Sequence, residues 1–131
     1  MYGSKTLKAS LSVSGIIGAA VGSTLLIAPA MMHGANGVDL GSNPSLLSEV
    51  RAPGGALLAL GVLVLAGAFV VRLAYPATMI AAIVYLAYGL SRLLSIALDG
   101  MPASGLILAA GLEITLGALN AVLLLRLRQD A

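Results

Sequence analysis

The sequence predicts an all-α membrane protein that crosses a bilayer four times, as an antiparallel up-down-up-down bundle with both ends in the cytoplasm. Three observations predict this fold class: the composition, four long apolar segments, and the placement of the basic residues. Of the 131 residues, 60% are hydrophobic and only 9% are charged, whereas about a quarter of a soluble domain is charged. A chain this short cannot bury so much apolar surface within itself, so lipid must surround much of it.

The apolar segments have the length that a membrane-spanning helix requires, which is about 20 residues. They cover about residues 7–32, 53–71, 77–98 and 104–125. Each is expected to be helical, because open strands leave backbone groups unpaired in lipid and four strands cannot close a barrel. Together they predict a single transmembrane domain over residues 1–131.

The connections between these segments are predicted to be short, except for one external loop at residues 33–52. The second half of this loop has the pattern of a short surface helix, with Asn43 as its cap and Pro44 in its first turn. Tight turns are predicted at residues 72–76 and 99–103. Short connections favour antiparallel neighbours.

The basic residues give the predicted orientation. Five of them flank the apolar segments at three places that an up-down topology puts on one side of the membrane: Lys5, Lys8, Arg72, Arg126 and Arg128. Basic residues near helix ends favour the cytoplasmic side. Both termini and the 72–76 turn are therefore predicted to be cytoplasmic.

Small residues predict where the helices pack closely. Ser14, Gly18 and Gly22 repeat at four-residue spacing in the first segment, and Gly54 and Gly55 begin the second. Faces of this kind let helix backbones approach each other in lipid. We interpret them as contacts within the chain, with self-association or docking on a larger complex as the alternative.

Two ionisable side chains lie inside predicted helices, and such groups are costly in hydrocarbon. From the predicted outer ends of their helices, the helical rise places Arg92 about 10 Å deep and Glu113 about 14 Å deep. Their similar depth and opposite charges predict a contact between them.

Further polar residues share these helix faces. Tyr85, Tyr88, Arg92, Ser95 and Asp99 share one face of the third helix, at spacings of three and four residues. Tyr88 lies at about the depth of Glu113, so its hydroxyl could donate to the carboxylate. Arg51 stands at the predicted outer mouth of the second helix. We call this set the polar seam: Arg51, Tyr88, Arg92, Ser95, Asp99 and Glu113. It has two interpretations, a structural ion pair that fixes the register of two helices, or a site for a ligand, a proton or a lipid head group. Asn120 is expected to form an interhelical hydrogen bond.

The composition also excludes several classes of site. With no cysteine, the chain has no disulfide and no thiolate chemistry, and His33 is its only histidine. One histidine without cysteine does not build a zinc site, so neither a metal nor a cofactor is expected. Basic residues scattered along the chain form no patch for nucleic acid.

The sequence also resembles a family of small bacterial four-helix membrane proteins, the domain of unknown function 4345 family. The resemblance is carried by Glu49–Gly55, Gly89–Ser95, Asp99–Pro102 and Glu113. It implies a four-helix protein of the bacterial cytoplasmic membrane in which these elements belong together. It implies no substrate or cofactor.

Three hypotheses for function follow. The first is a non-enzymatic accessory or scaffold subunit that packs against other membrane proteins or its own copies. The second is a small transporter or a lipid- or ligand-binding protein that uses the polar seam. A membrane enzyme is the least favoured, because so few side chains could carry chemistry.

Overall fold

The computed structural model describes residues 2–130 and forms five helices there, with no strand. Four of them are long and apolar enough to cross a membrane, which supports the prediction of a multi-pass membrane protein. The helices are α1 (Lys5–Ile27), α2 (Pro29–Gly34), α3 (Pro44–Gly67), α4 (Val71–Asp99) and α5 (Ser104–Gln129).

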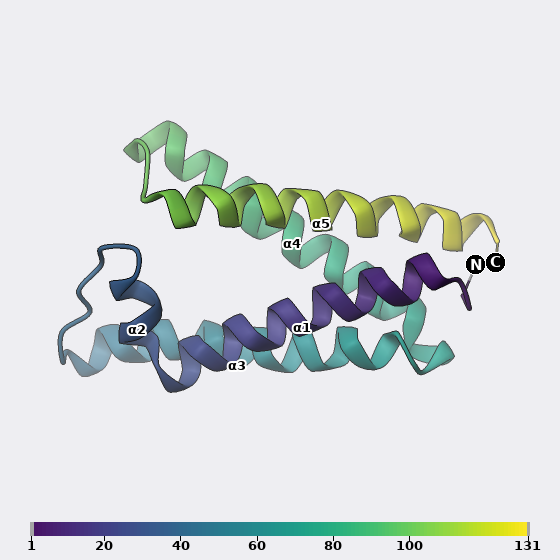
Figure 1. Ribbon diagram of the computed structural model, residues 1–131, viewed down its shortest axis with the longest axis horizontal. Coiled ribbons are helices and arrows are strands. Elements are labelled where there is room, and N and C mark those ends of the chain that lie inside the picture. The colour runs from purple at the N-terminus through teal and green to yellow at the C-terminus, as the bar shows by residue number, and fades with distance from the viewer. Residues whose placement is uncertain (1, 131) are drawn as a thin grey trace.

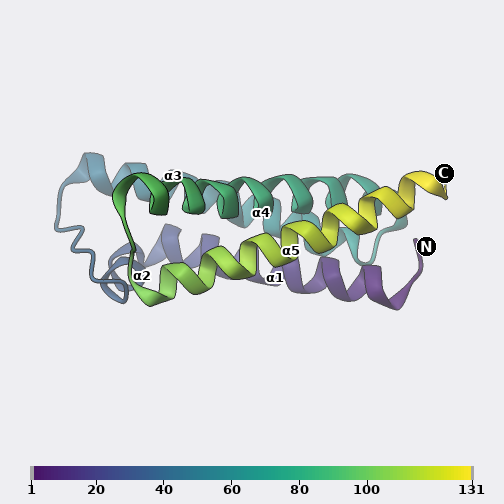
Figure 2. The ribbon, with the colours of Figure 1, turned by 90° about the horizontal axis from the view of Figure 1, so that it is seen from above.

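The long helices form two pairs. α1 packs along α3 and α4 packs along α5, while contacts between α3 and α4 join the pairs. Figure 1 shows both termini at one end of the molecule, with α2 and the connection between α4 and α5 at the other. Figure 2, seen from above, shows the same grouping of the ends. We call them the termini end and the loop end.

The first predicted helix, residues 7–32, is wrong at its end, because the structure divides it into α1 and α2. The division falls at Ala28, whose backbone has left the helical region (φ −133°, ψ 60°). Pro29 follows, and a proline disfavours helical geometry in the residue before it and cannot donate the next backbone hydrogen bond. α2 is therefore a separate short helix at the loop end.

The predicted loop at residues 33–52 is also wrong over its second half. Asn43 caps a helix as predicted, its Oδ1 accepting from the backbone N–H groups of Ser45 and Leu46. Instead of ending at the membrane surface, this helix continues through Pro53 to become the whole of α3. The non-helical part of the loop is confined to residues 35–43.

The turn predicted at residues 72–76 lies instead inside α4, and the chain reverses at residues 68–70. Gly67 ends α3, and a Cβ placed on it would lie 2.3 Å from Cβ of Ala77 in α4. The close approach that Gly67 permits sets the position of the reversal. Hydropathy did not reveal this turn, because residues 68–71 are as apolar as the helices that they join.

The fourth predicted helix, 104–125, begins where expected but extends to Gln129 and includes Arg126 and Arg128. Basic side chains in the last turn stabilise the negative end of the helix dipole. At the other end of this hairpin, Gly100 takes a positive φ of 96° after α4. Few residues other than glycine adopt this conformation easily, so it completes the tight turn predicted at 99–103.

The buried apolar core lies in the half of the molecule nearest the termini end. All four long helices contribute to it: Leu7, Leu11, Val64, Ala68, Ala74, Ala77, Ala81, Leu123 and Leu127. These positions come from the start of α1 and α4 and the end of α3 and α5. The helices are thus tightly packed near the termini end, and the space between the pairs lies nearer the loop end.

The crossing of α1 and α3 depends on glycines, only some of which were predicted. A Cβ on Gly22 would lie 2.3 Å from the backbone N of Leu58, and a Cβ on Gly61 would lie 2.3 Å from that of Ala19. Real Cβ atoms do not approach backbone so closely. Gly15 has a similarly close contact with the backbone of α3.

The other predicted packing positions differ from one another. Gly54 faces α1, and a Cβ there would meet Cβ of Leu25 at 2.7 Å, while Ser14 is buried. Gly18 is less tight, because its Cβ would keep ordinary contact distances of 3.4 Å or more. The prediction that Gly55 packs within the chain is wrong, because a Cβ there would meet nothing within 4 Å.

Candidate functional site

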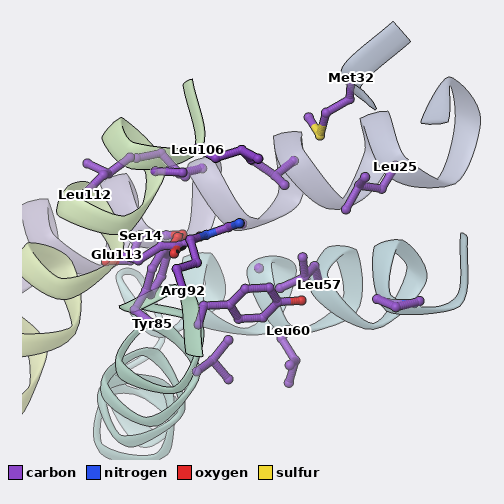
Figure 3. Close-up of a pocket in the computed structure, with 18 of the residues that line it drawn as sticks. Ser14, Leu25, Met32, Leu57, Leu60, Tyr85, Arg92, Leu106, Leu112 and Glu113 are labelled. Atoms are coloured by element: carbon purple, nitrogen blue, oxygen red, sulfur yellow. Dashed lines mark hydrogen bonds and ion pairs between the residues drawn. The ribbon is translucent and has the colours of Figure 1, made fainter. Parts of the chain in front are cut away.

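A cavity of about 660 Å³ separates the two helix pairs between the core and the loop end. Its walls are mainly aliphatic side chains from α1, α3, α4 and α5, including Leu25, Leu57, Leu60, Leu106 and Leu112, which surround the space in Figure 3. Ligand sites in proteins typically enclose roughly 300–1,000 Å³, with mostly apolar walls and a few polar groups. The cavity has both properties.

Arg92 and Glu113 form an ion pair on the wall of this cavity. Nε of Arg92 donates to Oε2 of Glu113 over 2.7 Å, which joins α4 to α5. The carboxylate side chain is 13% exposed and that of the arginine is 32% exposed. Figure 3 shows the two side by side, with the guanidinium reaching in among the other residues that line the cavity. The structure therefore brings together the two central members of the polar seam.

Two glycines position the pair by letting α4 and α5 touch. A Cβ on Gly89 would lie 2.5 Å from Cγ1 of Ile114, and one on Gly117 would lie 2.7 Å from Cγ of Leu86. Gly89 precedes Arg92 by about one helical turn, and Gly117 follows Glu113 by about one turn. The close approach on both sides of the pair places the two charged side chains within direct hydrogen-bonding distance.

A buried polar cluster closes the cavity toward the core. Asn120 of α5 donates through Nδ2 to Oγ of Ser14 over 2.9 Å, and Ser10 donates to its Oδ1 over 3.2 Å. The predicted interhelical hydrogen bond of Asn120 is thus confirmed, with α1 as the partner. Tyr85 of α4 donates its hydroxyl to the backbone carbonyl of Ser14. Three helices are fixed here by hydrogen bonds that the apolar surroundings strengthen.

Tyr88 lines the cavity but forms no hydrogen bond within residues 2–130, so the donation to Glu113 that its depth suggested is absent. Tyr85, a residue that the predicted seam left out, uses its hydroxyl instead. Spacing placed both tyrosines on one face of α4, but only the tilt of α4 relative to α1 decides which hydroxyl meets an acceptor.

Ser95 and Asp99 do not reach the ion pair. Oγ of Ser95 donates to Oδ2 of Asp99 over 3.3 Å on the exposed surface of α4. Neither residue lines the cavity. They lie nearer the loop end than Arg92, where α4 has moved away from α1 and α3, so this part of the predicted seam is wrong.

Arg51 is separate from the pair as well. Its guanidinium donates to the backbone carbonyl of Leu26, in the last turn of α1. The carbonyls of a last turn lack helical partners, and the break before Pro29 creates such an end here. Arg51 therefore ties α3 to the end of α1 and is not a member of the cavity wall.

The rim of the cavity is polar and lies at the loop end. Side chains from α2, the loop that follows it and the start of α3 contribute His33, Asn36 and Glu49. Nδ1 of His33 is 3.0 Å from the carbonyl of Pro29, and Asn36 donates to the carbonyl of Met32. In the described part of the chain no group of three potential metal-ligating side chains comes together.

The arrangement can hold an apolar molecule beside one ion pair. Arg92 provides hydrogen-bond donors and Glu113 provides an acceptor, and most of the lining is aliphatic. The sequence could not reveal the cavity, because its volume depends on the angle at which the helix pairs diverge.

Comparison with known proteins identifies a family. The model of a family described as a domain of unknown function, DUF4345, matches residues 6–124, which confirms the resemblance carried by Glu49–Gly55, Gly89–Ser95, Asp99–Pro102 and Glu113. No curated protein and no solved structure matched the chain.

Proposed function

The chain belongs to the DUF4345 family, and from its cavity we propose that it is a non-enzymatic membrane protein that binds an apolar, membrane-soluble molecule between its two helix pairs. One observation carries this proposal: a space of about 660 Å³ with aliphatic walls contains an ion pair at one place. A purely structural pair would be expected in a filled interior, where packing excludes voids of this size.

For this reason our proposal takes the ligand-binding hypothesis before the accessory-subunit hypothesis. The exposed apolar side chains on the outer faces need no partner protein, because lipid covers such faces. The cavity, by contrast, lies between the helix pairs, and lipid on the outer faces does not account for it. This observation supports the binding role.

We also propose that the termini end faces the cytoplasm of a bacterial cell and that the cavity opens toward the outer leaflet. Five of the seven basic residues lie near the termini end, as expected for cytoplasmic helix ends. A reporter enzyme that works only in the cytoplasm should be active when fused to the C-terminus. Activity only when it is inserted at Gly37 would reverse the orientation.

The binding proposal predicts that filling the cavity displaces a bound molecule. Ala109 of α5 lines the cavity, whereas Ala118 of the same helix is exposed on its outer face. The Ala109→Phe variant should lose a small molecule that the unaltered protein retains through mild detergent extraction. Native mass spectrometry measures this retention, and Ala118→Phe, the same change on the lipid side, should retain the molecule.

Equal retention by both variants, or none by the unaltered protein, contradicts the proposal. Recovery in a complex with another membrane protein, without any small molecule, would favour the accessory-subunit hypothesis instead.

A further inference from the structure

We propose that the occupant of the cavity is a neutral lipid whose head group carries both carbonyl and hydroxyl oxygens, as acylglycerols do. This inference rests on the proposed function, because it names the class of molecule that the same cavity binds. It follows from the hydrogen-bonding groups, the charge and the depth of the cavity wall.

The guanidinium of Arg92 has donors to spare. Only its Nε is bonded to Glu113, and the two terminal nitrogens have no partner within residues 2–130. The side chain is nevertheless two-thirds buried, and Figure 3 shows it among the residues that line the cavity. Both terminal nitrogens remain accessible rather than sealed off by protein atoms, so they can donate, and a ligand carbonyl at this point would accept.

The wall also offers an acceptor and a third donor. Glu113 is bonded through Oε2 alone, which leaves Oε1 able to accept from a ligand hydroxyl. Tyr88, whose hydroxyl has no hydrogen-bond partner in the described chain, also lines the cavity. A head group with both carbonyl and hydroxyl oxygens matches this set, and a pure hydrocarbon leaves all of it unsatisfied.

The charge of the wall opposes an anionic head group. Arg92 is the only lysine or arginine among the lining residues of the described chain, and Glu113 already neutralises it. The rim adds Glu49 and no basic residue other than His33. A phosphate or carboxylate beside the pair would therefore meet one compensated cation and an adjacent negative charge.

The depth of the ion pair also favours a neutral head group over a charged one. Arg92 is seven residues from the end of α4 at Asp99, which corresponds to about 10 Å along the helix axis. A phospholipid head group normally lies at the interface, and placing its charge this deep in hydrocarbon is costly. A neutral glycerol ester enters to this depth without that cost.

The test compares two lipids with the same chains, dioctanoylglycerol and dioctanoyl phosphatidate, by native mass spectrometry of the detergent-solubilised full chain. The glycerolipid should bind at least about tenfold more tightly. Arg92→Lys retains the charge for Glu113 but removes the planar set of donors, so it should weaken glycerolipid binding about tenfold, the effect of about one lost hydrogen bond to a charged group. Its thermal stability should stay close to that of the unaltered protein.

The outcomes separate the two proposals. Phosphatidate that binds as tightly as the glycerolipid, and is displaced by Ala109→Phe, would overturn the neutral-lipid inference while leaving the cavity as a binding site. Unchanged glycerolipid binding in Arg92→Lys would overturn it too. If Ala109→Phe and Ala118→Phe bind both lipids equally well, the binding is outside the cavity, and the proposed function fails with it.

Discussion

Replacing Gly61 with alanine should destabilise the protein by about 3 kcal/mol, the upper part of the range for overpacking a tight contact. The added Cβ would lie 2.3 Å from N of Ala19 and 2.8 Å from C of Gly18. All of its nearest neighbours are backbone atoms, so no rotamer change relieves the clash and α1 must move away from α3. Thermal or denaturant unfolding in detergent micelles measures the effect.

Gly55→Ala is the matched control for this substitution. It makes the same chemical change on the same helix, where the new Cβ meets nothing within 4 Å. Alanine is the better helix former of the two, so the control should be neutral or slightly stabilised. Equal destabilisation by both variants would mean that α1 and α3 do not cross at Gly61.

Removing one member of the ion pair should destabilise the protein more than removing both. Glu113→Leu leaves the charge of Arg92 without its partner and should cost about 2.5 kcal/mol of stability, in the lower part of the range for a charge in a membrane helix. The lower value applies because the arginine side chain is a third exposed and can reach toward the loop end. The double variant Arg92→Met with Glu113→Leu retains no charge and should recover most of this loss. Equilibrium unfolding of the two variants in the same detergent gives the comparison.

The double variant also distinguishes the two interpretations of the pair. If it unfolds like the unaltered protein and binds dioctanoylglycerol as well, the pair only fixes the register of α4 and α5. Normal stability with weakened binding is the expected result. A double variant as unstable as Glu113→Leu would contradict the ion pair itself, because the loss would then arise from the packing of the glutamate side chain.

The sequence was sufficient for the number of long helices and for the contact between the charged residues of α4 and α5. The length and composition of a spanning helix are set by the thickness of the hydrocarbon layer. Two opposite charges at similar depth are expected to pair, because an unpaired charge is strongly destabilising there. Spacing was enough to place Arg92 and Glu113 on faces of α4 and α5 that meet. These predictions depend on one helix or on neighbouring helices, for which the sequence is enough.

Features that depend on how helices tilt were not predictable from spacing. Tyr85, not Tyr88, finds an acceptor because α1 crosses α4 near Ser14. Gly55 is a different case: adjacent helix positions are about 100° apart, so spacing alone already indicated that Gly55 could not share the face on which Gly54 meets α1. The missed break at Ala28 is different, since Pro29 marked it in the sequence and the apolar residues around it concealed it.

Mapping the binding position with a photoreactive lipid tests the central claim most directly. Dioctanoylglycerol carrying a diazirine in one acyl chain should label residues that line the cavity, such as Leu57 and Val84, and excess unlabelled dioctanoylglycerol should abolish the labelling. Peptide mass spectrometry locates the labelled residues. Labelling confined to outward-facing side chains such as Ile83 and Leu108, which are 60% and 75% exposed, and not reduced by competition, would contradict the claim that this protein binds a lipid between its helix pairs.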